Sequence, residues 1–262
     1  MRTATDIQLW LAAGVRTPFA RSDGPLADFD AIQLSVIVVK NMMGRLRGAL
    51  PDLAVWGAVV PSLAWSNIAR EVLMDAGAPA TIPAFSTVMA CSTSMIAAIE
   101  AAGMIDGTNC NLALVGGVDV LSKVPLGLAQ PLSDWIVKFR QLRSLGQKLT
   151  NLVSLRPRDL RIYIPRIVNR TSGLSMGEHT EITAKEWGIA REDQDRLALE
   201  SHQRAIRGWE SGFFDDIVTP VGKLTRDTIP LTSQGKPDRE AIRALGRAGQ
   251  GQKQNRSGAE SQ

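Results

Sequence analysis

One of the chain's two cysteines, Cys91, stands among small residues in the stretch TVMACSTSMIAAIEAAG, residues 87–103. This pattern predicts a strand, a short turn and then a helix that begins near Ser92. The thiol would lie at the positive end of that helix, where the thiolate is favoured and backbone N–H groups can bind an oxyanion. Free cysteine is also among the most buried residue types. The residues alone therefore leave open both a nucleophile and a packing residue.

A nucleophilic thiol needs a proton acceptor within hydrogen-bond reach, and the chain holds only two histidines. His202 lies in a strongly charged segment that predicts a surface helix. His179 lies in the motif MGEHTE, which could bring it near Cys91. We favour a residue that lines the pocket over a catalytic base at this position. The second cysteine, Cys110, precedes an apolar run and is predicted to be a core or strand-edge residue. With no CxxC pair, we expect no metal site.

Bulk composition limits the classes of protein to be considered. Apolar residues make up 44% of the 262 residues, which is enough for a sizeable core, and aromatic residues only 5%. The net charge of +4 is too small to argue for nucleic-acid binding. There is no apolar run long enough for a transmembrane helix and no signal-peptide pattern. We expect a cytoplasmic protein in a reducing compartment.

Apolar runs alternate with helical patterns over the first part of the chain. This order predicts an α/β fold with a mixed, mostly parallel sheet covered by helices. The predicted strands are residues 7–13, 54–60, 82–88 and 111–122, the last being interrupted by two glycines. The predicted helices are residues 30–46 and 66–77, with Ser66 as N-cap and Gly77 as the stop of the second, followed by the helix after Cys91.

The composition changes after the last of these strands. We therefore divide the chain into an α/β core at residues 1–121, a mainly helical loop domain with its following helices at 122–228, and a tail at 229–262 that we expect to be disordered. Residues 136–170 carry nine Lys or Arg residues against one acid. Within residues 135–152, apolar side chains recur every three or four positions, which predicts one face of an amphipathic helix. We expect that face to be core, with membrane contact the less favoured alternative.

Three separated motifs resemble the thiolase family of acyl-CoA acyltransferases. The Cys91 segment with LALVGGVDVLS resembles the nucleophile region, GVRTPFARSDGPL the opening motif, and GLSMGEHTEITAKEWGIAREDQD the segment that lines the pocket. The resemblance covers roughly residues 7–228. It is nearest to the long-chain 3-ketoacyl-CoA thiolases of fatty-acid oxidation, which PLSDWIVKFRQLRSLGQKL also resembles.

This resemblance implies a specific chemistry. Cys91 would carry the acyl group as a thioester during fatty-acid β-oxidation, and its backbone N–H would be one oxyanion donor. Ser175, Met176, Gly177 and His179 would line the substrate pocket. Coenzyme A would be a substrate or product, with no tightly bound cofactor. The implied partners are acyl-CoA, further copies of the chain, or a hydratase/dehydrogenase subunit.

The sequence also departs from the thiolase pattern. The family's Gly-His-Pro motif and its second, glycine-rich cysteine motif do not occur here. We therefore expect a truncated chain that is inactive or impaired when alone. Two other classes stay open: a non-catalytic assembly module, and a decarboxylating condensing enzyme of fatty-acid or polyketide synthesis, which shares the cysteine-at-helix design.

Overall fold

The computed structural model describes residues 10–60, 62–107, 109–163 and 168–228. The chain divides into two units: unit 1 comprises Met1–Val124 and Glu192–Gln262, and unit 2 comprises Pro125–Arg191. The predicted core boundary at residue 121 lies near Val124, whereas the segment after Arg191 groups with the core and not with the loop domain. The predicted tail, 229–262, lies outside the described residues.

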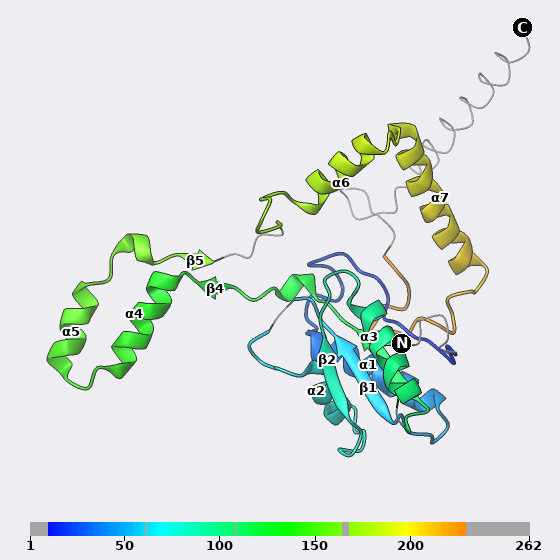
Figure 1. The fold of residues 1–262 in the computed structure, drawn as a ribbon, viewed down its shortest axis with the longest axis horizontal. Helices are drawn as coiled ribbons and strands as arrows, with labels where there is room; N and C mark the ends of the chain where they lie inside the picture. The colour runs from blue at the N-terminus through cyan, green and yellow to red at the C-terminus, as the bar shows by residue number, and fades with distance from the viewer. Residues whose placement is uncertain (1–9, 61, 108, 164–167, 229–262) are drawn as a thin grey trace, which may run out of the picture. The chain divides into compact units, whose positions relative to one another are not determined.

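Unit 1 is built on three parallel strands in the order β2-β1-β3, flanked by helices (Figure 1). Its elements, in chain order, are α1 (Ala31–Arg45), β1 (Leu53–Gly57), α2 (Ile68–Asp75), β2 (Ala84–Thr87), α3 (Thr93–Gly107), β3 (Ala113–Gly117), a 3-10 turn (Leu121–Lys123) and α7 (Arg191–Glu210). The prediction of a mostly parallel sheet covered by helices is confirmed.

The central strand β1 is buried along its whole length, as expected for a parallel strand that is covered on both faces. Side chains alternate between the two faces. Ala54 and Trp56 pack with α1 and α2, whereas Leu53 and Val55 pack with α3. The Trp56 indole N–H donates to the buried Ser35 hydroxyl on α1 at 3.0 Å, which satisfies both polar groups.

Local sequence explains most helix ends in unit 1. Asp30 caps α1 in a reciprocal capping box with Gln33. The cap of α2 is Asn67, whose side chain accepts from the Arg70 N–H, so the expectation for Ser66 was wrong by one residue. Asparagine takes this position because its amide also donates to the Ala84 carbonyl on β2. Gly77 ends the helix with a φ of +80°, as predicted.

Two predicted strands are incorrect in part. Residues 10–13 form no strand, and Trp10 and Leu11 are exposed; residues 7–9 lie outside the described residues. The chain at Arg16 instead pairs with residues 217–219, through Arg16 N–H to Ile217 O at 3.0 Å and Thr219 N–H to Arg16 O at 2.8 Å. Strand β3 runs through both glycines, and no second strand follows it: Val120 has an extended backbone and leads directly into the 3-10 turn.

Unit 2 contains a helical hairpin closed at its base by two short antiparallel strands (Figure 1). Its elements are β4 (Gly127–Leu128), α4 (Gln130–Gln141), α5 (Leu145–Val153), a 3-10 turn (Pro157–Asp159), β5 (Ile162–Tyr163) and α6 (Met176–Glu186). The single amphipathic helix predicted over 135–152 is wrong, because the chain leaves helical geometry at Leu142, which has an extended backbone. Gly188, with a φ of +64°, separates α6 from α7 as predicted.

Candidate active site

Parallel strands end at the same edge of a sheet, and the candidate nucleophile lies at that edge. Strand β2 ends at Thr87, Cys91 follows in the connecting turn, and α3 begins at Thr93. Cys91 is exposed, whereas Cys110 is buried beside β3, as predicted for a core residue. The predicted arrangement of strand, Cys91 and helix is therefore present, and the thiol is accessible to a substrate.

The turn that carries Cys91 is closed by the Thr93 side chain. Its hydroxyl accepts from the Met89 N–H at 2.9 Å and donates to the Ala90 carbonyl at 2.7 Å. Ala90 has a φ of +45°, a conformation that costs free energy for a residue with a Cβ. The buried Thr93 thus holds the residue before Cys91 in a left-handed conformation.

Glycines let the start of α3 sit directly against the strand ends. A Cβ on Gly57, the last residue of β1, would lie 2.0 Å from the Thr93 methyl group and 2.8 Å from the Thr87 carbonyl oxygen. A Cβ on Gly117, the last residue of β3, would lie 3.2 Å from the Ser94 hydroxyl. Sequence reasoning did not identify Thr93 or Gly57 as residues that position the site, although the glycine in AVWGAVV was a visible signal.

The Glu100 carboxylate of α3 contacts the strand end that precedes this turn. The Thr87 hydroxyl donates to Glu100 Oε1 at 3.1 Å and so ties the end of β2 to the second turn of α3. The other oxygen, Glu100 Oε2, is buried and has no hydrogen-bond partner among the described residues. Sequence reasoning did not single out this residue either.

The four predicted pocket residues come together at the start of α6 in unit 2. Ser175 is the N-cap, and it forms a capping box with Glu178: the Ser175 N–H donates to Glu178 Oε2 at 2.6 Å, and the Glu178 N–H donates to Ser175 Oγ at 3.3 Å. The backbone N–H of Ser175 lowers the pKa of the Glu178 carboxyl, and the Ser175 hydroxyl adds to this shift. Met176 is exposed, and a Cβ on Gly177 would lie 4.0 Å from the Ser175 hydroxyl oxygen.

His179 is already engaged within unit 2. Its Nε2 lies 2.8 Å from the Ser172 hydroxyl. Cys91 belongs to unit 1 and the segment 175–179 to unit 2, so a shared pocket stays a prediction. Within the described ranges, no three His, Cys, Asp or Glu side chains cluster as a metal site would require.

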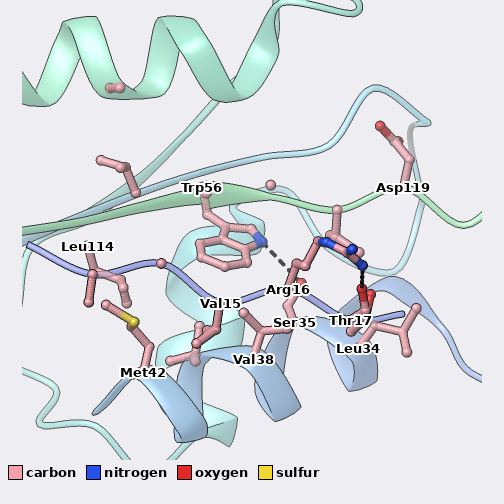
Figure 2. Close-up of a pocket in the computed structure, with 18 of the residues that line it drawn as sticks. Val15, Arg16, Thr17, Leu34, Ser35, Val38, Met42, Trp56, Leu114 and Asp119 are labelled. Carbon is pink, nitrogen blue, oxygen red and sulfur yellow. Dashed lines mark hydrogen bonds between the residues drawn. The ribbon is translucent and has the colours of Figure 1, made fainter. Parts of the chain in front are cut away.

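A cavity of about 600 Å³ lies elsewhere in unit 1 and does not include Cys91. It is lined by residues 10–22, by α1 and by β3 with the residues after it; Figure 2 shows Val15, Val38, Met42, Trp56 and Leu114 in its largely apolar wall. The cavity is lined by β3 and by residues 10–22, of which the sequence predicted residues 10–13 to be part of a strand.

Comparisons with known proteins agree with this geometry. A family model described as the thiolase N-terminal domain matches residues 9–240. Two 3-ketoacyl-CoA thiolases, from Yersinia pestis (strain Pestoides F) and Yersinia pseudotuberculosis serotype O:1b (strain IP 31758), are each 37% identical over 231 residues, which is 87% of this chain and 50% of theirs. The crystal structure of the Bacillus anthracis acetyl-CoA acetyltransferase matches with a TM-score of 0.61 and 26% identity, over 78% of this chain and 48% of that chain. The chain spans about half the length of the curated relatives it matches.

Proposed function

Because the chain belongs to the thiolase family, we propose that it takes part in acyl transfer between acyl-CoA thioesters, with Cys91 as the nucleophile. The observation that carries this proposal is the exposed thiol between β2 and α3, at the carboxyl edge of a parallel sheet. A cysteine that served only to fill the core would be buried, as Cys110 is.

The proposed substrate is a 3-ketoacyl-CoA of fatty-acid β-oxidation. The Cys91 sulfur, as thiolate, attacks the 3-keto carbon, and the bond between C2 and C3 breaks. The acyl group stays on Cys91 as a thioester, and the acetyl-CoA enolate leaves and takes up a proton equivalent to the one that Cys91 lost. The thiol of coenzyme A then attacks the thioester, releases a shortened acyl-CoA and restores Cys91.

Two features of unit 1 support the attack. The backbone N–H of Cys91, just before α3, is the proposed donor to negative charge that develops on the substrate, since the Ser92 and Thr93 N–H groups already donate to the Met89 and Ala90 carbonyls. The hydrogen bonds of the Thr93 hydroxyl and the close packing of Thr93 against Gly57 fix the turn, so that the Cys91 sulfur is held in place before the substrate arrives. The exposed Met176 side chain supports a substrate-contacting role for the start of α6.

Mass spectrometry of the intact protein tests the first half of this reaction. After incubation with acetyl-CoA, and separately with a 3-ketoacyl-CoA, we expect a gain of one acyl group that is absent in Cys91→Ser. The matched control is Cys110→Ser, which should keep the adduct. Folded wild-type protein without an adduct, or an adduct that persists in Cys91→Ser, would contradict the proposal and favour a non-catalytic assembly module.

A further inference from the structure

Glu100 is the one charged residue in the sequence from 93 to 105, and its side chain is turned toward the sheet. Its Oε1 accepts from the Thr87 hydroxyl at 3.1 Å, whereas its Oε2 is buried and has no hydrogen-bond partner among the described residues. A buried carboxyl oxygen without a donor is costly. Because an apolar side chain would avoid this cost, packing alone does not account for an acid at this position of α3.

The residue that Glu100 contacts is the one from which the Cys91 turn starts. Thr87 is the last residue of β2, is buried, and lies opposite Gly57 in the register of β1 and β2. Its carbonyl oxygen would lie 2.8 Å from a Cβ on Gly57. The end of β2 is therefore fixed from two directions, by the neighbouring strand and by the Glu100 carboxyl of α3.

Thr93 and Glu100 act on the two ends of the same turn. They are seven residues apart, which places them on one face of α3. The Thr93 hydroxyl bonds the turn at its helix end, and Glu100 bonds the preceding strand end. Between these contacts lies Ala90, whose φ of +45° persists only where the surrounding structure holds it. Two side chains of one helix face thus bracket the strained residue before Cys91.

We propose that Glu100 is a positioning residue for Cys91. Through the Thr87 hydroxyl it fixes the strand end, and together with Thr93 it keeps Ala90 left-handed, so that the sulfur is held in one position. Glu100 acts through Thr87 and not on the substrate. The inference rests on the proposed role of Cys91 as the nucleophile.

Alkylation of Cys91 by iodoacetamide tests this positioning without any acyl transfer. In folded Cys110→Ser protein, where Cys91 is the only thiol, Glu100→Leu should lower the rate constant about fivefold, because the strand end loses its contact with α3. Thr87→Val removes the hydroxyl at nearly constant shape and should lower the rate by the same factor. Both changes together should lower it no further, since they break one interaction. Glu100→Gln should keep the rate within about twofold, because an amide oxygen accepts the same hydrogen bond.

A second measurement distinguishes this inference from the proposed function. In acylation by acetyl-CoA, followed by mass spectrometry, Glu100→Leu should lower the maximal rate about tenfold. The acetyl-CoA concentration that gives half the maximal rate should stay within about twofold, because substrate binding is not altered. Protein that shows the expected alkylation rates but takes up no acyl group would contradict the proposed function while supporting the positioning of the thiol by Glu100.

The matched control is Leu73→Ala in the same background. It destabilises unit 1 from the opposite face of the sheet and should leave both rates unchanged in folded protein. The inference is overturned if Glu100→Leu is alkylated at the wild-type rate, if Glu100→Gln is slowed as much as Glu100→Leu, or if Leu73→Ala is slowed equally. If Glu100→Leu does not fold, the alkylation rate of Thr87→Val decides in the same way.

Discussion

The two faces of the unit 1 sheet are covered in different ways. On one face, α2 buries Ile68, Ala69, Val72 and Leu73 against the sheet and α1, so that these four side chains are enclosed and only Met74 among its apolar residues is exposed. On the other face, α3 buries Ala97 and Ala101 but leaves Met95 and Ile99 exposed on its far side. A helix that is apolar all round belongs in the interior of a larger structure. The face of α2 that is turned to the sheet is thus buried within the described residues. In contrast, α3 exposes large apolar side chains on the side that faces away from the sheet.

The largest expected effect separates these two faces directly. Leu73→Ala should lower the free energy of unfolding by about 3 kcal/mol, because Leu73 is enclosed and its removal leaves a cavity. Ile99→Ala should change it by less than about 0.5 kcal/mol, because the Ile99 side chain is already 59% exposed. Urea unfolding followed by circular dichroism measures both. Equal losses would show that α3 is already covered on its far side.

Close packing at the start of α3 gives the next effect. Gly57→Ala should cost about 2 kcal/mol, because the added methyl group would meet the Thr93 side chain and the Thr87 carbonyl. It should also lower the rate at which iodoacetamide alkylates Cys91 in folded protein, since the turn would shift. The control is Gly103→Ala within α3, where a Cβ has open space; it should stabilise the protein by about 0.5 to 1 kcal/mol. A Gly57→Ala protein with unchanged stability would contradict this account of the turn.

The partly buried ion pair between Arg16 and Asp227 gives a polar contribution to stability that can be compared with the apolar ones above. Asp227 accepts from both terminal nitrogens of Arg16 at 2.7 and 2.8 Å, from the Phe19 N–H at 2.7 Å and from the Trp209 indole at 3.1 Å. Burial alone would raise the pKa of Asp227, but the hydrogen bonds from Arg16 and Phe19 outweigh it and lower the pKa. Asp227→Asn should therefore cost about 1.5 kcal/mol at neutral pH.

The pH dependence of this cost follows from the sign of the shift. Because the folded pKa lies below the unfolded value of about 3.9, the stabilisation is complete well above that value. It is lost as the pH falls through the lower, folded pKa. The difference between wild type and Asp227→Asn should thus be constant above about pH 5 and shrink in acid. Glu200→Gln, which breaks the exposed pair with Arg204, should cost at most about 0.5 kcal/mol and serves as control.

Sequence reasoning succeeded where short-range patterns decide the structure. The order of strands and helices after residue 30, the turn at Cys91 between a strand and a helix, buried Cys110 and the stop at Gly188 follow from apolar periodicity and the placement of small residues. It failed at residues 10–13, because an apolar run does not specify its partner: the adjoining chain at Arg16 pairs with residues 217–219, some two hundred positions away. The hydrogen bonds of the Thr93 hydroxyl and the close contact between Gly57 and Thr93 were missed for the same reason. Both join residues that only the folded structure brings together.

The smallest expected effect on stability concerns the exposed face of α3 and tests the opening comparison most sharply. Ile99→Ser should leave the free energy of unfolding within about 0.5 kcal/mol of wild type, since the side chain is already mostly exposed. It should nevertheless reduce self-association at high concentration, measured by light scattering, because Val88, Met89, Met95 and Ile99 are all exposed within residues 88–99. Leu63→Ser is the control, because Leu63 is fully exposed but lies outside that segment. If Leu63→Ser reduces association equally, the effect is one of general surface polarity and α3 has no special need for cover. If only Ile99→Ser does so, the apolar face of α3 is the surface that this half of the thiolase fold leaves to be covered.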